Sequence, residues 1–377
     1  MKETTDSIPI PLEDYTKKLL PWAHGHQLKA ITTFVAAILE EQTGCQAQLA
    51  RGGANQEARV KRLARLIHNQ RIQPKDLAEA LLHQALSQVP LRGKVRLTLD
   101  WTSEDQQHLL VVSLVVGGRG LPIYWRAYDA RVLKGRRSRY ELAVVRRAGK
   151  LIFGHIAPDR IRLSADRGFA DVGLFGLFEE LGLHYIIRVK GSTKVCRDGQ
   201  WQKLNTVRFI GNARRRNLGR LHYCESSPRR LWVTMSRARN RKGAWGIWYL
   251  ISNHGHRAKA AAGEYGRRFS CEEGFRDTKW YLGFAQARIT AIAAWSRMFG
   301  LFVIALLVAV SLGIQLLARG GHWARALLRR VASRRGGRCE LSLVTAMVSL
   351  LQRDKSLFAH LSARIKLNLE ASLSNVS

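Results

Sequence analysis

Three carboxylates in this sequence have the residue type and setting to act together on a phosphate group: Asp100, Asp166 and Glu272. Carboxylate oxygens suit hard divalent cations such as Mg²⁺, which keep their remaining ligand positions for water and phosphate oxygens. Two such ions about 4 Å apart can activate an attacking oxygen and stabilise a leaving one. The chemistry that these residues would offer is therefore metal-assisted cleavage or transfer at a phosphodiester.

The segment around Glu272 predicts a helix with one charged face. Tyr265, Arg268, Glu272 and Lys279 stand at offsets 0, 3, 7 and 14, which at about 100° per residue places them in a stripe roughly 60° wide. Arg276 lies on the same side. Cations beside a carboxylate would hold the phosphates of a nucleic acid strand. Ion pairing between residues four apart explains the spacing around Glu272 as well, but not the length of the stripe.

The two aspartates each end a predicted strand. KVRLTLD alternates apolar and polar residues up to Asp100, and IRLSAD ends at Asp166 before a turn that contains Gly168. In an open sheet, a polar residue at a strand end next to such a turn is a common place for a ligand. A role as a helix N-cap or turn residue is the equal alternative for each aspartate.

The elements that must position these residues predict an α/β fold. Three antiparallel-type strands are followed by helix, strand, helix and strand. This order is the one found in ribonuclease-H-like nucleases, a mixed sheet flanked by helices. The predicted strands are 93–100, 108–116, 121–129, 161–166 and 184–191, and the helices are 138–154 and 172–181.

The rest of the chain divides by pattern into further regions. Residues 1–90 predict three helices, at 27–41, 55–69 and 74–87, with Arg59, Arg62 and Arg65 as a basic stripe. That stripe fits a DNA-binding domain or an ordinary solvated face equally well. The predicted domains are a helical DNA-binding domain (1–90), the first part of the catalytic core (91–191), a β-rich basic insertion (192–256), the second part of the core (257–318) and a C-terminal helical region (319–377).

The charge of the chain points to a polyanionic partner. Sixty-two Lys and Arg face 28 Asp and Glu, a formal net charge of +34. Nucleic acid is the natural partner, although a basic structural or ribosome-associated protein would share this excess. Positions 188–259 hold 18 Lys or Arg but only Asp198 and Glu225, interleaved with aromatics such as Trp245. Such a surface suits phosphate tracking and base stacking.

Two features bear on the location of the protein. The five cysteines are scattered without a CxxC pair and the N-terminus has no apolar signal core, which fits a reducing cytosol. Residues 298–318 carry no charge and are long enough to span a bilayer. We expect a buried core helix there, no membrane partner and a cytoplasmic, DNA-associated protein; a basic membrane protein is the alternative.

At these residues the chain resembles the DDE transposases of bacterial insertion sequences, in the group known by its YREK signature. The signature, Tyr-x2-Arg-x3-Glu-x6-Lys, stands here as Tyr265, Arg268, Glu272 and Lys279 with every spacing intact. LTLDWT resembles the first-aspartate segment of the group, LSADRGF the second, and RVKRLARLIHN part of its N-terminal domain. Phe269, where the group has Trp, and Cys271, where an aliphatic residue is common, depart from the pattern without removing a ligand.

The resemblance implies an activity and its residues. Asp100, Asp166 and Glu272 would hold two Mg²⁺ ions, with Mn²⁺ able to substitute. The protein would cut double-stranded DNA at the terminal inverted repeats of its element and join the 3′-hydroxyls to target DNA. Tyr265, Arg268 and Lys279 would contact phosphates near a flipped base, and Trp245 would stack on that base unless it is a packed core residue. A homodimer is expected because two ends are cut together.

Two other functions compete with this interpretation. A different ribonuclease-H-like nuclease would cleave DNA without strand transfer. A decayed copy would bind DNA and inhibit transposition without catalysis, although the complete set of three carboxylates argues against it.

Overall fold

The computed structural model describes residues 9–51, 55–86, 93–239, 243–319, 344–345 and 347–349. They form two compact units. The first comprises Met1–Val89, Leu121–Tyr128 and Glu273–Ser377, and the second comprises Pro90–Gly120 and Asp129–Glu272. The predicted C-terminal helical region, 319–377, lies almost wholly outside the described residues.

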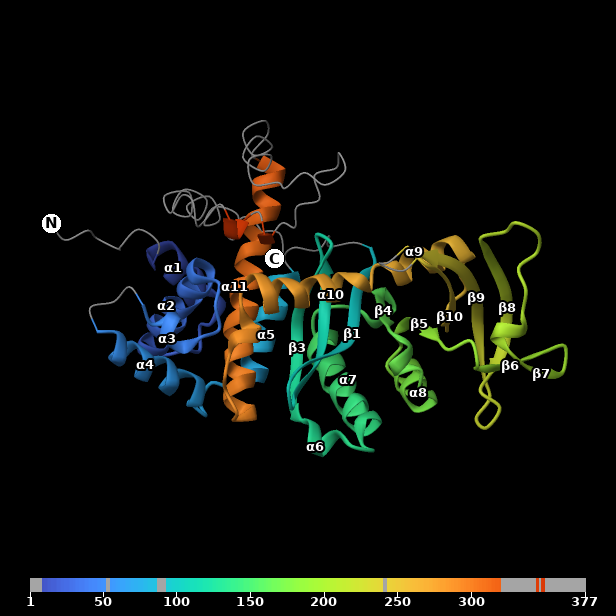
Figure 1. Ribbon diagram of the computed structural model, residues 1–377, viewed down its shortest axis with the longest axis horizontal. Helices are drawn as coiled ribbons and strands as arrows, with labels where there is room; N and C mark the ends of the chain where they lie inside the picture. Colours follow the sequence, from blue (N-terminus) through green and yellow to red (C-terminus); the bar gives the residue numbers. More distant parts are fainter. Residues whose placement is uncertain are drawn as a thin grey trace. The chain divides into compact units, whose positions relative to one another are not determined.

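The strands form one mixed sheet of ten strands, in the order β3-β2-β1-β4-β5-β10-β9-β8-β6-β7. Its first half has the predicted ribonuclease-H-like arrangement, with β1 antiparallel to β2 and parallel to β4, and β4 parallel to β5. These five strands are β1 (Val95–Glu104), β2 (Gln107–Val116), β3 (Arg119–Asp129), β4 (Ile161–Ala165) and β5 (His184–Val189) (Figure 1).

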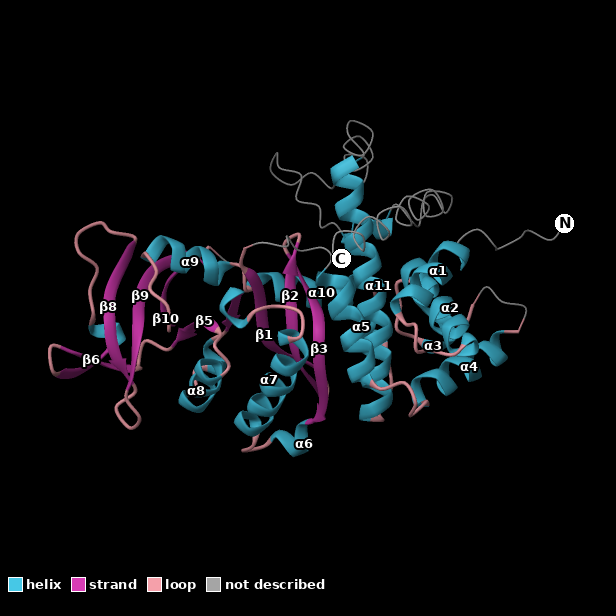
Figure 2. Cartoon of the chain, turned by 180° about the vertical axis from the view of Figure 1, so that it is seen from behind, coloured by secondary structure: helices cyan, strands magenta, loops and turns pink. Residues whose placement is uncertain are grey.

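The β-rich insertion continues this same sheet. β10 pairs antiparallel with β5, and β9 and β8 follow it outward. The backbone hydrogen bonds of the catalytic half therefore extend into the insertion without an exposed edge at β5. The added strands are β6 (Lys194–Arg197), β7 (Gln200–Lys203), β8 (Arg215–Tyr223), β9 (Arg229–Arg239) and β10 (Trp245–Ser252) (Figure 2).

Helices cover both faces of the sheet in the second unit. Tyr185 of β5 stacks on Phe175 of α8, with ring centroids 5.3 Å apart. The next residue, Ile186, points to the opposite face and packs in a buried cluster with Ala261 of α9. α7 packs beside α8 (Figure 1). The helices of this unit are α6 (Ala130–Leu133), α7 (Arg137–Phe153), α8 (Val172–Glu180), α9 (Ala258–Gly266) and the start of α10 (Phe269–Arg276).

The first unit is mainly helical. α11 packs against α2, α4 and α5, and Gly300 allows a close approach because a Cβ there would meet Leu77 Cδ1 at 2.8 Å. The three predicted N-terminal helices correspond to α2, α4 and α5, and two shorter ones join them. The helices are α1 (Pro9–Leu19), α2 (Gly25–Glu41), α3 (Gln46–Leu49), α4 (Gln56–His68), α5 (Pro74–Leu86) and α11 (Ile292–Arg319).

The long uncharged run forms the central helix of this unit. The Ile292–Ile314 stretch of α11 has a mean hydropathy of 2.3, and 94% of its most apolar window is buried inside the protein. Arg297 is also buried, and it donates to the backbone oxygens of Ile72 and Ile67 at 2.7 and 3.2 Å. Length and composition would let α11 span a bilayer, but its environment here is that of a core helix.

Candidate active site

Asp100 projects from the face of β1 that α9 covers. Arg96, on the same face of the strand, donates from Nε to Oε1 of Glu264 in α9 at 2.8 Å. Asp100 Oδ2 accepts from Arg268 Nη1 at 2.9 Å and from Cys271 Sγ at 3.2 Å. Burial raises the pKa of Asp100 to about 6 although Arg268 lowers it. A mostly buried carboxylate therefore depends on nearby positive charge to stay ionised.

Asp166 lies beside Asp100 on the neighbouring strand. β1 and β4 run parallel, with Leu99 opposite Ala165, so the next residues of the two strands are brought to one level. The charge of Asp166 contributes to raising the pKa of Asp100, so the Asp166 carboxylate lies near enough to act on the Asp100 carboxylate. Asp166 Oδ1 also accepts from Gly168 N at 2.7 Å, so it caps the short 3-10 helix Arg167–Phe169. Asp166 therefore both caps this short helix and lies close to Asp100.

Arg268 joins Asp100 to Glu272. Its Nη1 binds Asp100, and its Nη2 donates to Glu272 Oε1. The arginine side chain is 7% exposed, whereas the Glu272 side chain is 31% exposed. A planar guanidinium fork can serve two carboxylates at once, which a lysine ammonium does with less geometric definition. One cation thus links the middle of β1 to α10. The prediction that Asp100 ends its strand was wrong, because β1 continues to Glu104 and pairs with β2 over that length.

A glycine lets α10 approach the sheet closely. A Cβ at Gly120 would lie 2.7 Å from Cys271 Cα, a separation that real Cβ atoms essentially never show. The backbone before Glu272 therefore packs directly on the backbone at the start of β3. Placement of the glutamate depends on this absence of a side chain.

Comparison with known families gives this arrangement a name. Residues 135–308 match the family model described as the transposase DDE domain. The match includes Asp166 and Glu272 and begins after Asp100, so the first aspartate rests on its geometry alone. No curated protein matches the chain.

The three carboxylates Asp100, Asp166 and Glu272 fit a divalent cation by their chemistry. They offer only oxygen donors, and Asp100 and Asp166 lie at one level of adjacent strands. Among the described residues, however, no three His, Cys, Asp or Glu side chains are grouped closely enough to hold a metal ion. The guanidinium of Arg268 supplies the positive charge between Asp100 and Glu272 instead.

The helix predicted to carry the signature is interrupted. α9 ends at Gly266, α10 begins at Phe269, and a π-helical turn, Asp277–Tyr281, follows α10. The single stripe from Tyr265 to Lys279 was therefore wrong as geometry, because three helical segments do not share one 100° period. Lys279 lies in the π-helical turn.

Two residues of the predicted stripe have partners that the sequence did not indicate. Arg276 pairs with Glu273 rather than with Glu272. Tyr265 is buried, with its ring 5.1 Å from that of Trp248, and Arg268 lies over it at 5.8 Å from the ring centroid. In this structure the buried Tyr265 ring packs against the guanidinium of Arg268 and helps to hold it in place. Its predicted contact with DNA stays a prediction.

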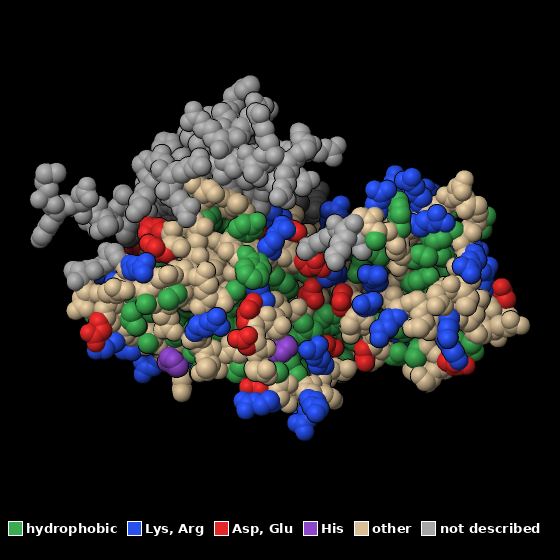
Figure 3. Space-filling model, viewed as in Figure 1, with side chains coloured by type: hydrophobic (Ala, Val, Ile, Leu, Met, Phe, Trp, Pro, Cys, Tyr) green, Lys and Arg blue, Asp and Glu red, His purple; other side chains and the backbone are tan. Residues whose placement is uncertain are grey.

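Trp245 is an exposed aromatic at the start of β10. Its side chain is 55% exposed, which excludes the alternative of a packed core residue. Arg239 of β9 pairs with it across the sheet and lies 4.7 Å from its ring centroid. Side chains of Lys and Arg gather over this part of the second unit, around β8 and β9 (Figure 3). The combination would suit stacking on a base next to a phosphate. The predicted stacking of Trp245 on a flipped base stays a prediction.

Sequence reasoning missed the role of Trp101, which follows Asp100. Its Nε1 donates to Glu141 Oε1 of α7 at 2.7 Å, and Arg137 lies 5.3 Å from its ring centroid. Because Glu141 and Arg137 both contact the Trp101 side chain, they help to fix the position of the β1 segment that carries Asp100. The pattern LTLDW gave no sign of these partners, because they lie 36 and 40 residues further along the chain.

Proposed function

We propose that the chain is a Mg²⁺-dependent DNA transposase of the YREK-signature group. It would cut phosphodiester bonds at the ends of its insertion sequence and join the 3′-hydroxyls to target DNA. The observation that carries this proposal is the link from Asp100, beside Asp166 on adjacent strands, through Arg268 to Glu272. A purely structural ion pair does not require a second carboxylate on the same arginine.

Asp100, Asp166 and Glu272 would hold the metal ions. When bound, two Mg²⁺ ions, or Mn²⁺ in their place, activate the attacking oxygen and stabilise the leaving oxygen. The protein keeps the three carboxylates on rigid elements: the middle of β1, the end of β4 and one helix packed on Gly120. Rigid placement matters because small errors in the position of a reacting group cost large factors in rate.

Arg268 would exchange partners when DNA binds. A guanidinium fork matches a phosphate as well as it matches a carboxylate. In the free protein the fork neutralises Asp100 and Glu272, and with DNA and metal present it would bind a phosphate of the element end. Arg276 and Lys279 would add charge for the same strand, Tyr265 would orient Arg268, and Trp245 would stack on a flipped base.

The remaining regions would serve the same reaction. Residues 1–90 would form a DNA-binding domain, in which Arg62 and Arg65 of α4 are exposed. The protein would act in the cytoplasm as a homodimer on two terminal inverted repeats, because cleavage of both ends must be coordinated.

The experiment is a supercoiled-plasmid assay with Mg²⁺, using as substrate the inverted repeats that flank the gene. We expect cleavage at the repeats and joining to target DNA, and loss of both in Asp100→Asn and Glu272→Gln. Asp129→Asn is the matched control, since Asp129 is a carboxylate of the same unit that pairs only locally with Arg131.

The alternatives give different results in this assay. Cleavage without joined products would identify a nuclease without strand transfer. Binding of the repeats without cleavage would identify an inactive copy. Cleavage by Asp100→Asn at the wild-type rate would overturn the assignment of the site.

A further inference from the structure

A cationic pocket lies on the opposite face of the sheet from the Asp100 carboxylate. Its volume is about 690 Å³, and it is formed by the start of β2, by α6 and by the start of α7. Four of the nine lining residues are Lys or Arg: Lys134, Arg136, Arg137 and Arg139. None of the nine is acidic, so the wall of the pocket carries a net positive charge, although Glu141 lies near Arg137 and Asp129 near His108.

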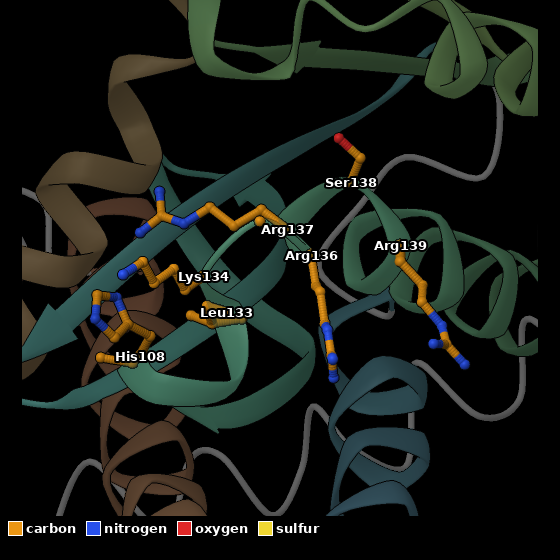
Figure 4. Close-up of a pocket in the computed structure, with 9 residues that line it drawn as sticks. His108, Leu133, Lys134, Arg136, Arg137, Ser138 and Arg139 are labelled. Atoms are coloured by element: carbon orange, nitrogen blue, oxygen red, sulfur yellow. The ribbon is translucent and has the colours of Figure 1, made fainter.

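Three of the lining side chains converge. Figure 4 shows Arg137, Lys134 and His108 pointing toward one another, whereas Arg136 and Arg139 point away from this group. They come from the start of α7, the loop before it and β2. Lys134 is exposed and has no ion pair with a carboxylate in the part of the chain that the structure describes. Converging nitrogen donors from separate elements fit one anionic group with several acceptor oxygens, such as a phosphate.

The pocket is tied to the candidate active site through Trp101. Arg137 lies 5.3 Å from the centroid of the Trp101 ring, and the ring of His108 meets it edge-on at 6.4 Å. Trp101 is the residue after Asp100. His108 pairs with Ser103, three residues beyond Asp100, or about 10 Å along an extended strand.

We propose that this pocket binds a backbone phosphate of the DNA on which the protein acts. The proposal rests on the proposed function. Lys134 and Arg137 bind the phosphate oxygens directly, and Trp101 transmits the position of Arg137 to the strand that carries Asp100. The pocket contributes affinity and register but no base specificity, because phosphate contacts are independent of sequence.

The first test measures the salt dependence of DNA binding by the full chain. Affinity for a fluorescent duplex is titrated at several salt concentrations, in the absence of divalent metal. We expect Lys134→Ala to reduce the slope of log K against log salt by about 1, as for the loss of one phosphate contact. Lys150→Ala, in the exposed last turn of α7 and away from the pocket lining, is the control and should leave the slope unchanged. Equal slopes for wild type and Lys134→Ala would overturn the proposal.

The second test needs no variant and identifies the source of the phosphate. Lysine acetylation is followed by mass spectrometry with duplex DNA, with inorganic phosphate, or with neither. We expect the duplex to protect Lys134 and not Lys150, and inorganic phosphate at the same phosphate concentration to protect neither. Protection of Lys134 by inorganic phosphate but not by the duplex would replace the DNA site by a small-anion site.

These outcomes separate the pocket from the proposed function. The footprint of Lys134 should persist in Asp100→Asn, which removes catalysis and leaves the pocket intact. A retained footprint together with full cleavage by Asp100→Asn would reject the catalytic assignment and keep the pocket. Loss of cleavage in Asp100→Asn, without protection of Lys134 by DNA, would reject the phosphate-binding pocket and keep the catalytic assignment.

Discussion

Arg268 Nη1 lies 2.9 Å from Asp100 Oδ2, and this ion pair closes a contact between residues 168 positions apart. The two side chains are 7% and 16% exposed. Breaking a buried pair by removing one partner leaves the other charge desolvated, at a cost of roughly 3–5 kcal/mol. The ion pair therefore makes Arg268 important for stability in the metal-free protein as well as for DNA binding.

We expect Arg268→Ala to lower the free energy of unfolding by roughly 3–5 kcal/mol, measured by urea denaturation in the presence of EDTA. Arg267→Ala, an exposed neighbour, should change it by less than about 0.5 kcal/mol. Arg268→Lys should fall between the two, because it keeps the charge but loses the fork. If Arg268→Ala and Arg267→Ala unfold at the same urea concentration, the ion pair does not form in solution.

Gly120 is expected to tolerate no side chain. Its Cβ would lie 2.7 Å from Cys271 Cα and 3.1 Å from Ser270 O, so Gly120→Ala should push α10 away from the sheet. Overpacking of this kind costs about 1–3 kcal/mol, and DNA cleavage should fall further than stability because Glu272 moves with the helix. Gly263→Ala in α9 is the control, since no atom lies within 4 Å of its added Cβ. An active, stable Gly120→Ala would refute the close approach.

The elements of the sheet were predictable from the sequence, and the connections among the site residues were not. Alternation up to Asp100 and Asp166 reflects burial of one side of each strand, which is a local signal. The break between α9 and α10 has no such signal, because tertiary contacts of Arg268 and Tyr265 set it. The spacing of the signature residues still follows a 3.6-residue period across this break. The sequence therefore predicts one helix, whereas the structure has three segments: α9, α10 and a π-helical turn.

Partners distant in sequence set the rest of the site. Arg276 pairs with Glu273, whereas Glu272 pairs with Arg268. Arg268 in turn pairs with Asp100 of β1, a residue far away in the sequence. The continuation of the sheet from β5 into β10 was likewise invisible, because alternating strands with basic turns indicate strands but not their neighbours. Composition predicted a basic surface on the insertion, and it is present around Arg239 and Trp245.

Two tryptophans of β10 should separate binding from stability. Trp245 is 55% exposed, so Trp245→Ala should leave the unfolding transition unchanged and weaken binding of a duplex with an unpaired base by about 1–3 kcal/mol. Trp248 packs between Tyr265 and Phe269 at 5.1 and 5.8 Å, so Trp248→Ala should lower stability, by somewhat less than the roughly 3–5 kcal/mol of a fully buried tryptophan. Unchanged DNA affinity in Trp245→Ala would remove it from the DNA-binding residues.

Three histidines beside α9 should make the stability of the second unit depend on pH. The rings of His184 and His254 lie 4.7 Å apart, and those of His254 and His256 lie 5.3 Å apart. Burial lowers the pKa of all three, and Arg162 and Lys94 lower it further. The carboxylates Asp159 and Glu264 oppose this shift at His184 and His256 respectively.

The lowered pKa values fix the direction of the effect. The unfolded chain binds protons below about pH 6.5 while the native state still resists them, so stability is full above that pH and falls as the pH is lowered through it. We expect the Tm of wild type to drop between pH 7.5 and 5.5, and the drop to be smaller in His256→Asn, which removes one of the three groups. His68→Asn, on the exposed side of α4, should keep the wild-type drop. An identical drop in His256→Asn would show that other groups control the acid transition.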